Sequence, residues 1–67
     1  MDLSARNQLT GTIKSIKVSG LMAEVVVLIG GQELVSVITA SSAKRLKLKK
    51  GDEIAAVIKA TEVMIAK

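Results

Sequence analysis

The chain has 67 residues and a net charge of +4 at pH 7, and 49% of its residues are apolar although it contains no Phe, Tyr, Trp, Cys or His. This length suffices for one domain, residues 1–67, and the missing Cys and His exclude disulfides, thiolate or imidazole metal sites and Cys- or His-dependent catalysis. Because a domain this small buries only about 60% of its unfolded surface, its many aliphatic side chains predict that neighbouring subunits cover part of it.

Three strands are expected in the first half of the chain, at residues 8–18, 21–29 and 32–38. Gly11 interrupts the first of them, as at a bulge or a close backbone approach. The apolar run at residues 25–29 predicts a strand buried on both faces, one of them against another subunit. A Ser-Gly pair and a Gly-Gly pair mark the two connecting turns.

The second half begins with a helix signal. Thr39 is placed as the N-cap of a short helix that starts with Ala40. After a Lys-Gly-Asp turn, a fourth strand is expected at residues 53–60 and a fifth at residues 63–65. Five short strands with one small helix between the third and fourth predict an all-β, OB-like five-stranded barrel. A flat sheet would leave one face of the apolar run in water, and barrel closure also removes exposed strand edges.

Three clusters of hydrogen-bond donors are the candidate functional residues. They are Ser4 with Arg6 before the first strand, Lys59 with the Ala60 and Thr61 backbone at the end of the fourth, and Thr39 with Ser42 at the helix start. Hydroxyls, backbone N–H groups and fixed positive charges suit an anion, and no cluster contains a carboxylate. Each also has a purely structural interpretation: an exposed terminal arginine, an outward-facing lysine and a simple helix cap.

Catalysis finds no support in the sequence. The acidic residues are scattered, the serines have no histidine base, and Gly30-Gly31 lacks the Gly-Lys-Ser/Thr ending of a phosphate-binding loop. OB-folds often bind single-stranded nucleic acid by stacking bases on aromatic side chains, and this chain has none. The basic stretch at residues 44–50 is interpreted as a solvated face, with non-specific phosphate attraction as the alternative.

No segment has the pattern of a signal peptide or a membrane span. The first residues lack an apolar run after a basic one, and no apolar stretch approaches the roughly 20 residues needed to cross a bilayer. The absence of cysteine fits a reducing compartment. The expectation is a cytoplasmic protein with no membrane partner.

Five segments together resemble the molbindin (Mop) family of small molybdate- or tungstate-binding proteins. They are SARNQL at residues 4–9, AEVV at 23–26, SVIT at 36–39, KGDE at 50–53 and AVIKATEVMI at 56–65. The resemblance covers nearly the whole chain, and the order and spacing of its two end segments are specific. It implies an OB-like barrel assembled as a hexamer, a trimer of dimers, that binds oxyanions where subunits meet.

Carried over by motif, the resemblance implies that one chain contributes Ser4, Arg6, Lys59 and the Ala60 backbone, while a neighbour contributes Thr39 and Ser42. A second oxyanion site is implied at the turn after the first strand, around Ser19, Gly20 and Met22.

The expected function is therefore storage or buffering of molybdate or tungstate without catalysis. The metal is bound only as its oxyanion, and no cofactor, resident metal ion or nucleic acid is expected. The alternatives are a regulatory or delivery module that docks on a molybdenum-handling partner, and a nucleic-acid-binding OB domain.

Overall fold

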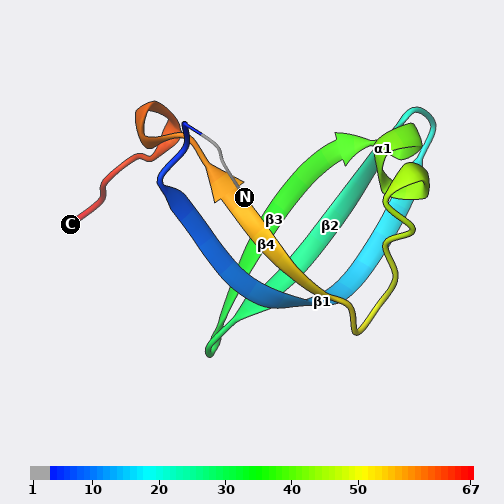
Figure 1. Cartoon of the computed structure of the whole chain (residues 1–67), viewed down its shortest axis with the longest axis horizontal. Helices are drawn as coiled ribbons and strands as arrows, with labels where there is room; N and C mark the ends of the chain where they lie inside the picture. Colours follow the sequence, from blue (N-terminus) through cyan, green and yellow to red (C-terminus); the bar gives the residue numbers. More distant parts are fainter. Residues whose placement is uncertain (1–3) are drawn as a thin grey trace.

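The computed structural model describes residues 4–67, which form one curled antiparallel sheet and two short helices (Figure 1). In chain order the elements are β1 (Asn7–Ser19), β2 (Met22–Ile29), β3 (Gln32–Thr39), α1 (Ala40–Arg45), β4 (Glu53–Ile58) and the 3₁₀ helix η1 (Ala60–Glu62). The strand order is β3-β2-β1-β4. The all-β, OB-like fold with one short helix between the third and fourth strands is confirmed. Within residues 4–67, no helix has the length and apolarity that a bilayer crossing requires.

The long strand β1 is central to the sheet because it pairs with two other strands. Its first half pairs with β4, from Asn7 opposite Ile58 onward, and its second half pairs with β2. The register shifts between Ile13 and Ser15, where the extra residue makes a bulge that bends the strand. Bending one strand in the middle lets a four-stranded sheet curl toward a barrel.

Gly11 lies where β1 presses against β2. A Cβ atom at this position would stand 2.6 Å from the Leu28 carbonyl oxygen and 2.6 Å from Val27 Cγ1. Real Cβ atoms do not approach other atoms this closely, so a larger residue would force the strands apart. The prediction of a close backbone approach at Gly11 is confirmed.

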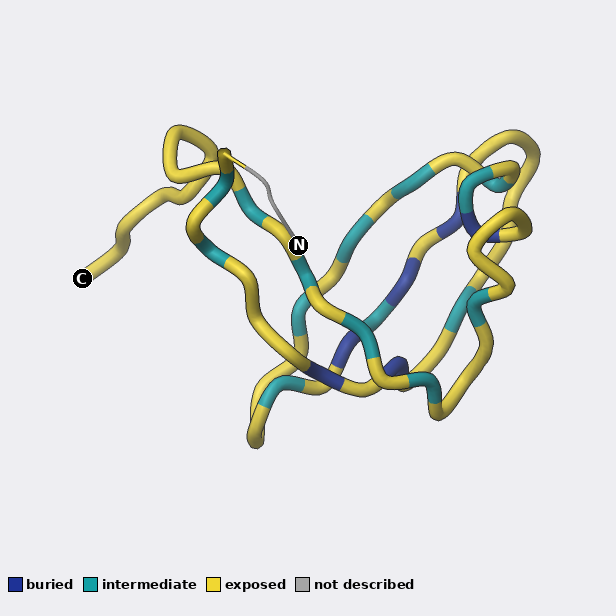
Figure 2. Tube along the Cα trace, in the orientation of Figure 1, coloured by how far each residue is buried: buried dark blue, intermediate teal, exposed yellow. Residues whose placement is uncertain are grey.

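The core is small and lies on the concave face of the sheet. Ile13, Val25 and Val27 form its centre and are at most 4% exposed. Side chains of residues 25–29 alternate between the two faces, and Leu28 on the face away from the core is 38% exposed in the single chain, so the expected burial of that face against another subunit stays a prediction. The tube in Figure 2 shows how little of the chain is fully buried.

The turns and the helix cap form where the sequence indicates. Gly20 and Gly30 adopt φ values of 60° and 62°, which glycine reaches without strain. Thr39 caps α1, and its Oγ1 accepts a hydrogen bond from the Ser42 N–H at 3.1 Å. Lys44 and Arg45 occupy the last turn, where their positive charges interact favourably with the negative end of the helix dipole.

The fifth strand expected at residues 63–65 is not formed, so the curled sheet has four strands rather than the five expected. The fourth strand ends at Ile58 instead of residue 60 because Ala60–Glu62 turn into η1. This turn directs the last residues away from the sheet (Figure 1), and no strand edge among residues 4–67 pairs with them. Met64 and Ile65 are consequently 93% and 89% exposed.

Candidate functional site

Two segments from opposite ends of the sequence meet beside the paired ends of β1 and β4. Because Asn7 pairs with Ile58, the residues just before β1 and just after β4 are neighbours in space. They enclose a shallow cavity of about 240 Å³ whose lining residues are Ser4, Ala5, Arg6, Lys59, Ala60 and Thr61. The four residues predicted to act together from one chain, Ser4, Arg6, Lys59 and Ala60, are therefore brought together.

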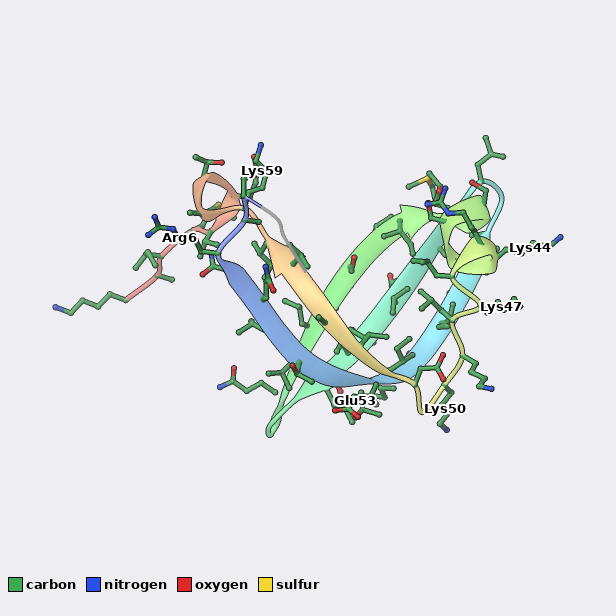
Figure 3. All side chains as sticks on the ribbon, in the orientation of Figure 1. Arg6, Lys44, Lys47, Lys50, Glu53 and Lys59 are labelled. Atoms are coloured by element: carbon green, nitrogen blue, oxygen red, sulfur yellow. The ribbon has the colours of Figure 1, made fainter. Side chains whose placement is uncertain are left out.

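The cavity carries two positive charges and no negative one. Arg6 and Lys59 both line it, and Figure 3 shows their side chains at the same end of the molecule. No carboxylate is among the lining residues, and across residues 4–67 the ion pair formed is the distant one between Lys14 and Glu33. An anion entering here would meet guanidinium and ammonium donors that carboxylates of residues 4–67 do not already engage.

Backbone donors add to this charge. In η1 the Glu62 N–H donates to the Lys59 carbonyl at 2.9 Å. The N–H groups of Ala60 and Thr61, which precede Glu62 in the same turn, donate to no acceptor within residues 4–67. Such orphan donors are normal at the start of a helix, where water or a ligand satisfies them.

Ala5 and Thr61 also line the cavity, although motif reasoning assigned Ala5 no role and Thr61 only a role for its backbone. The signal for Thr61 was available, because a hydroxyl follows the Lys-Ala pair directly. What the sequence did not show is the tight turn of η1, which brings residue 61 back beside Lys59 instead of continuing the strand.

The predicted partner residues Thr39 and Ser42 form a separate cluster of hydroxyls. The Thr39 hydroxyl donates to Ser42 Oγ at 2.7 Å and lies 3.2 Å from Ser41 Oγ. With Thr39 donating to Ser42, Ser41 donates to Thr39, and the Ser42 hydroxyl proton remains for an outside acceptor. Thr39 therefore positions this cluster, whereas Ser42 presents its free donor.

The turn predicted as a second site lies beside this cluster. Met22 pairs with Thr39, and the Ala40 N–H donates to the Leu21 carbonyl at 2.7 Å. Ser19, the last residue of β1, and Gly20, in the connection to β2, lie at the same end of the molecule. The structure thus places the helix start and the β1–β2 turn side by side.

The two donor regions lie at opposite ends of β1. The strand runs for 13 residues from Asn7 to Ser19, which corresponds to roughly 40 Å of path at about 3.3 Å per residue. Arg6 and Lys44, labelled in Figure 3, mark the two ends. A single anion therefore cannot touch Arg6 and Ser42 of the same chain.

The chemistry of both regions suits an anion rather than a cation. Among residues 4–67 no group of three or more Asp, Glu, His or Cys side chains is placed to hold a metal ion. The donors on hand are hydroxyls, N–H groups and cationic side chains, which bind oxygen acceptors.

Comparisons with known proteins agree on one family. The TOBE domain matches residues 3–65. Molybdenum-pterin-binding protein 1 of Clostridium pasteurianum is 47% identical over 66 residues, which is 97% of each chain. The molybdate-binding protein of Sporomusa ovata superposes with a TM-score of 0.96 at 42% identity over the full length of both chains. The cytoplasmic molybdate-binding protein ModG, in a crystal form with molybdate bound, gives a TM-score of 0.85 at 46% identity over 90% of this chain and 43% of its own. The chain is a TOBE-domain protein and belongs to the molbindin (Mop) family.

Proposed function

We propose that this protein binds molybdate or tungstate in the cytoplasm, without catalysis, and stores or buffers the oxyanion at interfaces between its subunits. The observation that carries the proposal is the cavity between the chain ends, where Arg6, Lys59 and Ser4 meet with no carboxylate in the lining. The names of the relatives, molybdenum-pterin-binding and molybdate-binding proteins, point to the same class of ligand.

A donor-only site matches the chemistry of these anions. Molybdate and tungstate are tetrahedral dianions at neutral pH, with acceptor oxygens and no proton. Monohydrogen phosphate would bring a hydroxyl proton into a cavity whose lining has no carboxylate to receive it. An unpaired polar group in a site closed from water costs about 1–3 kcal/mol. The same donors therefore favour molybdate over phosphate.

Subunit contact is proposed to close the site. The cavity of one chain is shallow, and its lining residues Arg6, Lys59 and Thr61 are exposed to solvent. Because the Ser42 hydroxyl lies at the far end of β1 with a proton to donate, it can reach the anion only from another copy. A ligand bound between chains also stabilises the assembly, since only the assembled state holds it.

Isothermal titration calorimetry with molybdate, tungstate, sulfate and phosphate tests the proposal. We expect micromolar or tighter binding of molybdate and tungstate, because several charge-assisted bonds of about 1.5–3 kcal/mol each exceed the cost of association. Phosphate is expected to give almost no heat. Equal responses to all four anions would reduce the cavity to a generic positive patch.

Calorimetry with single-stranded oligonucleotides addresses the nucleic-acid alternative. Base stacking needs aromatic side chains, which the chain lacks, and aliphatic residues line the concave face of its sheet. Single-stranded oligonucleotides are therefore expected to bind weakly, with an affinity that falls steeply as salt is added. Salt-resistant oligonucleotide binding would contradict the proposal.

A further inference from the structure

Half of the chain's cationic side chains are concentrated in one short stretch. Residues 44–50, which we call the basic segment, contain five of the 10 Lys and Arg residues of the chain and no acidic residue. The rest of the chain holds five cationic and six acidic residues and is therefore close to neutral. The net charge of +4 thus originates from one place on the surface, where it creates a strong local positive potential.

The cations of the basic segment are not neutralised by carboxylates of residues 4–67. They are exposed to solvent, and across the described residues the ion pair formed is the one between Lys14 and Glu33. The acid that follows the segment, Asp52, instead accepts a hydrogen bond from the Lys49 N–H at 3.0 Å. This bond fixes the backbone at the end of the segment and leaves its five charges available to a partner.

The backbone of the basic segment is also fixed where α1 ends. The Leu48 N–H donates to the Ala43 carbonyl at 3.1 Å. The Lys47 N–H donates to the Lys44 carbonyl at 3.0 Å. Together these are the two hydrogen bonds of a Schellman motif, which ends a helix in one defined conformation. A surface that is already ordered loses little conformational entropy when a partner binds to it.

Lys47 occupies a position that glycine would fill with less strain. Its φ is 54°, and among residues 4–67 it is the one non-glycine residue with a positive φ. This conformation brings the Cβ of an L-residue close to the following carbonyl oxygen, so Schellman motifs usually have glycine here. A lysine needed only for solubility could stand at a neighbouring position without that strain. The placement of Lys47 therefore indicates a role for its side chain outside the fold.

An exposed leucine lies in the middle of this positive charge. Leu46 is 60% exposed, whereas Leu48, two residues further on, packs against the buried core. Protein interfaces combine an apolar centre with a polar rim. A phosphate backbone offers no apolar partner to Leu46, and the chain has no aromatic residue on which a base could stack. The combination of charge and Leu46 favours a protein partner over a nucleic acid.

We propose that the basic segment is a docking surface for an acidic segment of a partner protein. Carboxylates of the partner pair with the five cations, and an apolar side chain of the partner packs against Leu46. A second copy of this chain does not fit this description, because two basic segments repel each other and the acidic residues of the chain are scattered along its sequence.

The docking surface is separate from the anion cavity. In Figure 3 the labelled lysines of the basic segment lie away from Arg6 and Lys59, which line the cavity. Docking therefore goes beyond oxyanion binding and does not depend on it. The interpretation of residues 44–50 as a solvated face explains their exposure but accounts for neither the strained Lys47 nor the exposed Leu46.

Fluorescence anisotropy with three labelled probes tests the chemistry of the partner. The probes are a short peptide of Glu, Gly and Leu, a peptide of equal charge with Ser in place of Leu, and an oligothymidylate of the same length. We expect the Leu-containing peptide to bind most tightly, the Ser-containing peptide to bind roughly five- to tenfold more weakly, and added salt to weaken both. Tighter binding of the oligothymidylate than of the Leu-containing peptide would identify a phosphate-binding surface and overturn the proposal.

A pair of variants with the same change in net charge tests the location. Lys47→Glu reverses a charge within the basic segment, and Lys67→Glu reverses one at the exposed end of the chain. Lys47→Glu is expected to weaken binding of the Leu-containing peptide roughly 10- to 30-fold, because a close attraction becomes a repulsion. Lys67→Glu is expected to leave the affinity nearly unchanged. Equal losses in the two variants would reduce binding to net charge and overturn the proposal.

Lys47→Gly separates docking from folding, because the two respond in opposite directions. Relief of the left-handed strain is expected to raise the melting temperature by about 2–6 °C. Loss of the charge is expected to weaken binding of the Leu-containing peptide roughly fivefold. A higher melting temperature with unchanged peptide affinity would make Lys47 a merely solvated residue and overturn the proposal.

Calorimetry with molybdate on the same variant distinguishes docking from oxyanion binding. Lys47→Gly is expected to bind molybdate as the wild type does, since Lys47 is not among the residues that line the cavity. Loss of molybdate binding in Lys47→Gly would assign Lys47 to the anion site and overturn the separate docking surface. Peptide binding by a wild type that binds no molybdate would instead reject the proposed function alone.

Discussion

Removing the guanidinium of Arg6 should weaken molybdate binding by roughly 10- to 150-fold. Arg6 lines the cavity, and no carboxylate of residues 4–67 is paired with it. The anion therefore does not have to break an ion pair to bind Arg6, and the whole interaction is lost when the guanidinium is removed. One charge-assisted hydrogen bond is worth about 1.5–3 kcal/mol, and each 1.36 kcal/mol is tenfold in affinity. Coulomb's law agrees, since a dianion about 4 Å from a unit charge gains about 2 kcal/mol even in water.

The assay is isothermal titration calorimetry of Arg6→Ala beside Lys50→Ala at fixed ionic strength. Lys50 carries the same charge but lies far from the cavity, as its label in Figure 3 shows. Lys50→Ala is expected to bind molybdate nearly as the wild type does. Arg6→Lys should fall between, because it keeps the charge but loses the planar fork of donors. If Arg6→Ala weakened binding no more than Lys50→Ala, Arg6 would be a contributor to net charge and not a ligand.

Three further predictions concern stability, each measured by thermal unfolding at one protein concentration. Gly11→Ala should destabilise the protein by about 1–3 kcal/mol through overpacking and so lower its melting temperature. Gly31→Ala should leave the melting temperature unchanged, because a Cβ there has open space around it. Equal effects of the two substitutions would show that Gly11 is not in close contact with β2. Thr39→Ala should destabilise by about 1 kcal/mol through loss of the N-cap, and Thr39→Ser should restore most of it. Lys14→Ala should lower the free energy of unfolding by at most about 1 kcal/mol, because the Lys14 and Glu33 side chains are 51% and 48% exposed. A larger loss would show that this ion pair contributes more to stability than an ordinary surface pair.

Local signals in the sequence fix most of the fold. Glycines at the two hairpin turns and Thr39 at the helix start place the boundaries of β1, β2, β3 and α1 within one or two residues. Each of these signals acts through its own backbone, whether as a positive φ or as a cap. No long-range information is needed to interpret them.

The sequence is a weaker guide where the burial of a side chain depends on another surface. Val63, Met64 and Ile65 have the composition of a strand, but a strand needs a neighbouring edge, and η1 turns them away from every edge of their own chain. The apolar run at residues 25–29 likewise indicates two covered faces, of which the single chain covers one. Composition shows that a side chain avoids water but does not identify the chain that covers it.

The candidate site follows the same division. Ser4 and Arg6 come together with Lys59 and Ala60 because β1 and β4 pair at their ends, so motif and topology agree within one chain. Thr39 and Ser42 belong to the same proposed site only if another chain brings them there, and the length of β1 separates them from Arg6. The turn at Ser19 and Gly20 remains a prediction for a second site.

Native mass spectrometry with and without molybdate tests the central claim most directly, because one spectrum reports both the number of subunits and the mass of bound oxyanion. The account predicts an oligomer, a hexamer by the family resemblance, that gains mass in steps of molybdate and gains none from phosphate. A single folded chain that retains molybdate tightly would contradict it, because the donors of one chain would then suffice.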